Sequence, residues 1–115
     1  NAMELGIPSE VWRYYLLVNR PEKADTVFTW SDFVTKNNNE LMPNLANLCN
    51  RVLKFIFSME ATVPAPGELQ PIEIDLLRDL ESKFVLYHKL MSDVQIKDSL
   101  RLAMEMSSLI NKYLQ

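Results

Sequence analysis

Hydrophobic residues within residues 31–60 recur at intervals of three, four and seven, which is the spacing of one face of an α-helix. A second apolar set adjoins this face, so more than half of the helix circumference is apolar. The first set consists of Val34, Leu41, Leu45, Leu48, Val52, Phe55 and Met59, and the second of Met42, Ala46, Cys49 and Leu53. We therefore expect a central helix with its core face turned inward and several neighbouring helices packed around it.

Local features refine this predicted central helix. Ser31 is expected to cap its N-terminus with a side-chain hydroxyl. Pro43 lacks an N–H group and is expected to kink or split the helix within residues 37–39. Cys49 lies on the apolar side and is expected to be an inert, buried thiol. The remaining polar stripe, where we expect function, consists of Glu40, Asn44, Asn47, Arg51, Lys54 and Ser58.

Three further helices are predicted on the same grounds. The first begins near Ser9 and ends before Pro21, because the residue that precedes a proline is pushed out of helical geometry. The proline-containing residues 61–70 form a loop. Pro71 suits the first position of a third helix that runs to about residue 93, and a fourth begins near residue 96. The pattern predicts an all-α helical bundle.

Composition agrees with a helical domain that has a single core. The chain has 115 residues, 48% of them hydrophobic and 23% charged, and only two glycines, fewer than a sheet with tight hairpins needs. One cysteine excludes an internal disulfide and a cysteine-rich zinc site. No run reaches the roughly 20 apolar residues of a membrane span. Asn1 and Ala2, ahead of Met3, resemble a tag remnant.

The charge pattern bears on nucleic-acid binding. The formal net charge is −3, and acidic and basic residues are mixed along the whole chain. A protein that holds DNA mainly through phosphates would show a basic footprint. A module that reads a few unstacked RNA bases needs only a local site, so the pattern argues against DNA and leaves RNA open.

Candidate chemistry is sparse. His88 has no second histidine or reachable thiol with which to form a metal site or a catalytic triad, so no catalytic or metal-binding residue is predicted. Asn47 and Arg51 are four residues apart, so their side chains converge on one patch of a helix. An amide beside a guanidinium offers acceptors and donors to a nucleic-acid base. The alternative is ordinary surface polarity on the wet side of a helix.

Three blocks of the sequence resemble the eukaryotic-type methionyl-tRNA synthetases. The likeness covers most of the chain, and it is strong to about residue 57 and weaker but collinear afterwards. Its motifs are Gly-Ile-Pro-Ser-Glu-Val-Trp-Arg-Tyr-Tyr-Leu-Leu from Gly6, Arg-Pro-Glu from Arg20 with Asp-Thr-x-Phe-Thr-Trp-x-Asp-Phe from Asp25, and Asn-Asn-Glu-Leu from Asn38 with Asn-Leu-x-Asn-x-x-Asn-Arg-Val-Leu-x-Phe from Asn44.

The resemblance implies two parts of a longer enzyme. Residues 1–30 are expected to be the tag remnant plus a stem-contact segment at the end of the catalytic region. Residues 31–115 are expected to be the helical anticodon-binding domain of class I synthetases, truncated at its C-terminal end. The HIGH and KMSKS signatures are absent from this sequence. ATP, Mg²⁺ and methionine chemistry therefore belong to the parent ligase, and this fragment is expected to carry no cofactor and no catalytic centre.

The resemblance also implies a site and partners. In the family, an asparagine and the arginine one turn later help to recognise the CAU anticodon, chiefly its cytosine, and they match Asn47 and Arg51. Asn44 and Lys54 are expected to contact the tRNA backbone. A third determinant, a tryptophan soon after the fourth helix, has no counterpart before Gln115. The implied partners are initiator and elongator methionine tRNAs in the cytoplasm, with protein partners of a synthetase complex as a further class, and neither DNA nor a membrane.

Two other interpretations remain open at this point. A helical docking module could bind other proteins through the third and fourth helices, where acidic and basic residues alternate. A related class I synthetase of different specificity could use the same helical domain, although the Arg20-Pro21-Glu22 and Phe28-Thr29-Trp30 blocks argue against it.

Overall fold

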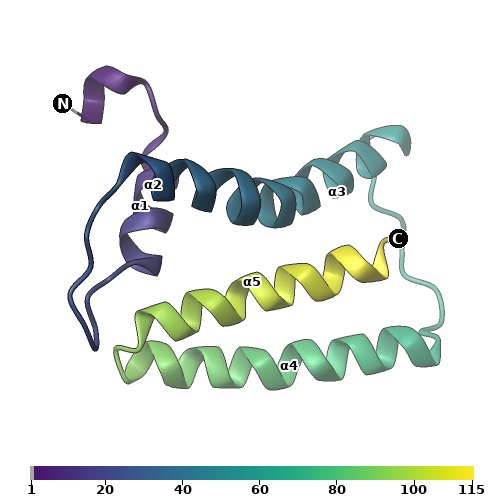
Figure 1. Cartoon of the computed structure of the whole chain (residues 1–115). Coiled ribbons are helices and arrows are strands. Elements are labelled where there is room, and N and C mark those ends of the chain that lie inside the picture. Colours follow the sequence, from purple (N-terminus) through teal and green to yellow (C-terminus); the bar gives the residue numbers. More distant parts are fainter. Residues whose placement is uncertain (1) are drawn as a thin grey trace.

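All regular structure in the described residues, 2–115, is helical in this computed structural model (Figure 1). In chain order the elements are the 3-10 helix η1 (Ala2–Leu5), α1 (Ser9–Val18), α2 (Trp30–Lys36), the π-helix η2 (Asn37–Ala46), α3 (Asn47–Ser58), α4 (Pro71–Ser92) and α5 (Ile96–Tyr113). The prediction of an all-α fold is confirmed. Among the described residues, none of the helices combines the length and the hydropathy that crossing a bilayer requires.

The predicted central helix is a continuous rod in which α2, η2 and α3 follow one another without a loop. Its middle third departs from α-helical geometry, as expected, because Pro43 cannot donate to the preceding turn. The backbone instead widens into a π-helix, where the amide of Asn47 reaches back to the carbonyl of Met42. The predicted cap at Ser31 is wrong: the capping residue is Thr29, two residues earlier, whose side chain accepts the Asp32 amide at 3.1 Å.

The long helices are stacked in the order rod, α5 and α4, so α5 is the middle element. Figure 1 shows α5 lying between the rod and α4, and α4 and α5 form an antiparallel hairpin. Helix α1 packs against both the rod and α5 at one end of the molecule. Ser99 and Ser107 are buried on α5, and side chains this small let the neighbouring helices approach closely. Because α5 touches α1, the rod and α4, it is the element that positions the others.

The core is thinner than the hydrophobic pattern predicts. Leu41, Leu48, Val52 and Met59 are half-buried, whereas three residues of the predicted core face, Val34, Leu45 and Phe55, are exposed. Cys49 is also exposed, so the prediction of a buried thiol is wrong. The physical reason is that α1 and α5 cover only one side of the rod within this chain.

An aromatic cluster joins α1 to the start of the rod. The rings of Trp12, Tyr15, Phe28, Trp30 and Phe33 contact one another, with the closest centroids, those of Trp12 and Phe33, 4.6 Å apart. Tyr15 and Phe33 are buried at its centre. The two motif blocks that flank the connector therefore form one packed unit.

Both ends of α5 are held by side chains from elsewhere in the chain. At its N-terminus, Glu22 Oε1 accepts the backbone amide of Lys97 at 3.1 Å, and Arg20 donates to the carbonyl of Val94 at 3.3 Å. At its C-terminus, the Arg51 guanidinium donates to the carbonyl of Leu114. A carboxylate at the N-terminus and a cation at the C-terminus both match the polarity of the helix dipole.

Candidate nucleic-acid interface

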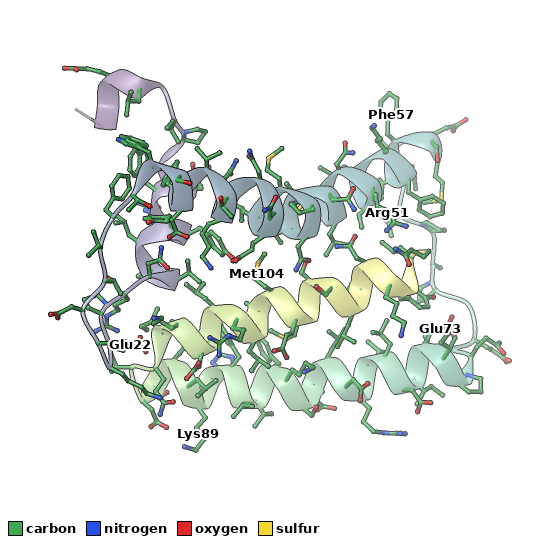
Figure 2. All side chains as sticks on the ribbon, in the orientation of Figure 1. Glu22, Arg51, Phe57, Glu73, Lys89 and Met104 are labelled. Atoms are coloured by element: carbon green, nitrogen blue, oxygen red, sulfur yellow. The ribbon has the colours of Figure 1, made fainter. Side chains whose placement is uncertain are left out.

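Asn47 and Arg51 lie one turn apart in α3, and both donate hydrogen bonds to the last turn of α5. Figure 2 shows Arg51 on the side of α3 that faces α5. Both residues follow the break in the rod at Pro43. Asn47 is the first residue of α3, where regular α-helical geometry resumes. Asn47 is exposed and Arg51 is half-buried. The structure thus places the two predicted site residues side by side, within reach of solvent.

The Arg51 guanidinium binds oxygen atoms of α5 that carry no full charge. Its Nη1 donates to the backbone oxygen of Asn111 at 3.1 Å and to the Asn111 Oδ1 at 3.4 Å, and its Nη2 donates to the carbonyl of Leu114. No ion pair within the described residues joins Arg51 to an acidic side chain. Neutral oxygen atoms therefore orient the guanidinium, and its positive charge is not neutralised by an ion pair with these residues.

Asn111 connects three residues of the polar stripe, Asn44, Asn47 and Arg51, to α5. Its Nδ2 donates to the backbone oxygen of Asn44 at 2.9 Å, while its Oδ1 accepts from Asn47 and Arg51 at 3.4 Å each. The sequence reasoning missed this residue. Its position could have indicated this role, because Asn111 lies one helical turn after Ser107 and therefore on the packed face of α5.

Asn44 and Lys54, the two predicted backbone contacts, lie in different surroundings. The Asn44 amide donates to the backbone oxygen of Met104 and to Ser108 Oγ, both at 2.8 Å, so it also joins the rod to α5. Lys54 is exposed on α3 and does not line the pocket that Asn44, Asn47 and Arg51 share. The structure therefore brings three of the four residues together, and their roles toward RNA stay predictions.

A pocket of about 200 Å³ opens where the rod meets the end of α5. Amide and guanidinium groups dominate its lining, which provides both donors and acceptors. Its walls are Pro43, Asn44, Asn47, Arg51, Ser108, Asn111, Lys112 and Gln115. Such a lining suits the polar edge of a flat heterocycle better than it suits an apolar ligand.

The pocket at Asn47 and Arg51 is not lined by His, Cys, Asp or Glu side chains, which carry most redox and hydrolytic chemistry. Within residues 2–115, no three His, Cys, Asp or Glu side chains stand close enough to hold a metal ion. His88 lies away from the pocket on α4, where its ring contacts Phe84 with centroids 4.5 Å apart. What this pocket offers is hydrogen bonding and positive charge.

Comparisons with known proteins connect this geometry to a family. Residues 1–53 match the family model described as tRNA synthetases class I (M). The chain is 44% identical over 117 residues to a probable cytoplasmic methionine–tRNA ligase of Dictyostelium discoideum, covering 99% of this chain and 16% of that protein. It is 43% identical over 122 residues to a probable methionine–tRNA ligase of Oryza sativa subsp. japonica, covering 100% of this chain and 15% of that protein.

The human relative gives the same result. The chain is 38% identical over 114 residues to the cytoplasmic methionine–tRNA ligase of Homo sapiens, covering 99% of this chain and 13% of that protein. The chain thus spans 13% to 16% of the length of these three relatives. Over practically its whole length, this chain is homologous to one segment of the methionine–tRNA ligases.

Proposed function

We propose that this chain is the part of a methionine–tRNA ligase that recognises the CAU anticodon of methionine tRNAs. The observation that carries the proposal is an exposed amide, Asn47, beside Arg51, which forms no ion pair with an acidic side chain among residues 2–115, and both line a polar pocket. The ligase would attach methionine to the initiator and elongator tRNAs in the cytoplasm.

Cytosine suits the donors and acceptors at this pocket. The Asn47 Nδ2 is directed at Asn111, which leaves its Oδ1 free to accept from the exocyclic amino group of cytosine. The Arg51 guanidinium can donate to the ring nitrogen and the carbonyl oxygen on the same base edge, or stack on the base. A uracil at this position presents a carbonyl where cytosine presents an amino group, so it would face the Asn47 oxygen with like polarity.

The division of the chain follows from the same proposal. Residues 1–30, with four of the five rings of the aromatic cluster, would contribute to the stem-contact segment, and residues 31–115, with Phe33, to the anticodon-binding domain. ATP and Mg²⁺ would act in the catalytic domain of the longer ligase, and we assign no residue of this chain to them. The reaction chemistry therefore lies outside the site described here.

An Arg51→Ala change in the full-length ligase tests the proposal. Loss of a well-placed arginine contact to a base costs about 1–3 kcal/mol, so kcat/KM for tRNA should fall by about 5- to 150-fold. Methionine-dependent ATP–pyrophosphate exchange, which needs no tRNA, should stay unchanged. Arg78→Ala, on the exposed side of α4, is the matched control. An equal loss in both assays would count against the proposal.

Lys54 has a different expected signature. Because a lysine acts on phosphate as a point charge, Lys54→Ala should weaken binding of all tRNA sequences alike. The slope of log affinity against log salt should become shallower by about one. A change in anticodon preference instead would remove Lys54 from the backbone-contact role.

One observation favours a second function, docking of another protein through α4. Four apolar side chains of this helix are more than half exposed, namely Ile72, Leu77, Phe84 and Val85. Specific retention of one protein partner in the absence of tRNA would favour this alternative. Retention of tRNA that depends on the anticodon would favour the first proposal.

A further inference from the structure

The folded chain concentrates its positive charge along one groove, although its net charge is −3. A pocket of about 920 Å³ lies between the rod, α1 and α5, and it adjoins the smaller pocket at Asn47 because both are lined by Pro43, Asn44, Ser108 and Lys112. Together they form one continuous feature, which we call the α5 groove. Among the described residues, it is lined by six of the chain's twelve basic side chains but by only two of the fifteen acidic ones.

The basic residues come from several elements but share one wall on α5. Lys97, Arg101 and Lys112 lie on the face of α5 that also presents Met104 and Ser108, at steps of four, three, four and four residues. The other three, Lys36, Arg51 and Lys83, project from α2, α3 and α4. The sequence shows no such segregation because acidic residues alternate with these lysines along the chain.

Acidic neighbours neutralise only part of this charge. Lys36 pairs with Glu40 at 2.8 Å and Lys83 with Glu105 at 3.0 Å, which accounts for both acidic residues of the groove. Arg101 pairs with Asp98 at 3.0 Å, outside these two pockets. Within residues 2–115, no ion pair engages the Lys97 or Lys112 ammonium groups. Positive charge is therefore left over at both ends of the groove.

We propose that the α5 groove binds the sugar-phosphate backbone of the RNA strand whose base is read at Asn47 and Arg51. The inference rests on the proposed function. The fifteen steps from Lys97 to Lys112 rise about 22 Å along the helix axis, at roughly 1.5 Å per residue. That distance matches about six stacked nucleotides at about 3.4 Å each. The strand would run from the base pocket along α5 toward α1.

The chemistry of the groove favours a phosphate backbone over an apolar partner. Five of the sixteen residues that line its larger pocket are basic and three more are amides, Asn19, Asn39 and Asn44. Charge of this kind binds phosphate without reading sequence. The groove is also continuous with the base pocket. A strand held at the pocket would therefore meet the lysines with no break in the surface.

The double variant Lys97→Ala with Lys112→Ala tests this inference in the full-length ligase. The control is Arg78→Ala with Lys89→Ala, which removes the same charge from the exposed side of α4, away from the groove. Binding of anticodon stem-loop hairpins is measured by fluorescence anisotropy over a series of salt concentrations, and thermal unfolding checks that each variant folds. Polyglutamate is included as a competitor.

The groove variant should weaken hairpin binding and make the slope of log affinity against log salt shallower by about 1.4 to 1.8, at roughly 0.7 to 0.9 per lost phosphate contact. The control should leave the slope unchanged. Shortening the hairpin stem should reduce the affinity of the wild-type ligase to that of the variant. Preference for a CAU loop over other loops should persist in the variant.

Two results would overturn the inference. One is an equal slope in the groove variant and the control while the CAU preference is intact, in which case the proposed function stands alone. The other is displacement of the hairpin by polyglutamate at equal charge concentration, which would make the groove a site for acidic peptides. If the wild-type ligase binds CAU and other loops equally well, the proposed function is contradicted. A shallower salt slope in the groove variant would in that case still support phosphate binding by the groove.

Discussion

Arg51 of α3 donates from Nη1 to the backbone oxygen of Asn111 in α5, over 3.1 Å. The arginine proposed to read a base is therefore oriented by the last turn of a different helix. A long, flexible side chain loses several rotatable bonds when it binds, so fixing it in advance lowers the entropy cost of recognition. The position of α5 thus bears directly on the site.

Changing Asn111 should affect both positioning and stability. Asn111→Ala removes the acceptor shared by Asn47 and Arg51, together with the side-chain donor to the Asn44 carbonyl, which keeps the backbone amide of Asn47. We expect about 1 kcal/mol lower stability and a several-fold weaker preference for CAU in aminoacylation. Asn111→Asp also lacks the amide donor to the Asn44 carbonyl, so it should lose at least as much stability as the alanine variant, and its carboxylate beside Arg51 should raise KM for tRNA further. Equal KM values for the Asp variant and the wild-type ligase would contradict a positioning role.

Glu22 is expected to stabilise the N-terminus of α5. Its Oε1 accepts the Lys97 amide at 3.1 Å, where negative charge also suits the helix dipole. Glu22→Ala should lower the free energy of unfolding by about 1 kcal/mol. Glu22→Gln keeps an acceptor and should lose roughly half as much. Urea denaturation measures both, and an Ala variant as stable as the wild type would refute the capping role.

Tyr14 gives the fold a dependence on alkaline pH. Burial, together with the hydrogen bond that its hydroxyl donates to Glu40 at 2.9 Å, raises the pKa of Tyr14 above its ordinary value of 10. The protonated form is thus favoured in the folded state. Its contribution to stability is complete below about pH 10 and is lost as the pH rises beyond it.

Tyr14→Phe removes this hydroxyl while keeping the ring. The variant should be about 1 kcal/mol less stable at neutral pH and should lose less stability than the wild type between pH 9 and 11. Denaturant titrations at several pH values measure the difference. Parallel pH profiles for the two proteins would show that Tyr14 is not the titrating group.

Val94 occupies an unfavourable backbone conformation in the turn between α4 and α5, with φ of 59°. A β-branched residue is strained there, whereas glycine adopts this region freely. Val94→Gly should therefore raise the free energy of unfolding by about 1 kcal/mol, since the Val94 side chain is mostly exposed. Asp93→Gly, at φ of −81°, is the control and should destabilise. Lower stability of the Val94 variant would contradict this explanation.

Much of the fold follows from the sequence because helices depend on local signals. Pro71 begins α4 as expected, with Gln70 and Glu73 forming a capping box, and α5 begins at Ile96. Pro43 interrupts the α-helical geometry of the rod, as predicted, because it has no backbone N–H group. The exposure of Phe55 and Cys49 could not be predicted in this way, since periodicity shows which residues are apolar and not what covers them.

The candidate site is only partly a local property. Asn47 and Arg51 could be selected from their spacing within one helix. Asn111 could not, because it meets them only after α5 packs against the rod, 60 residues away from Arg51 in the chain. The basic groove has the same origin. Lys36, Lys83 and Lys112 converge from three helices, and nothing in their order along the chain predicts that they share a surface.

The central claim is that Asn47 and Arg51 read an anticodon base. Its most direct test compares kcat/KM for a CAU methionine tRNA and for the same tRNA with UAU, in the wild-type full-length ligase and in its Asn47→Ala and Arg51→Ala variants. We expect a strong wild-type preference for CAU that falls by about 5- to 150-fold in each variant, at about 1–3 kcal/mol per base contact. A preference that persists in both variants, with the two tRNAs losing activity equally, would contradict it.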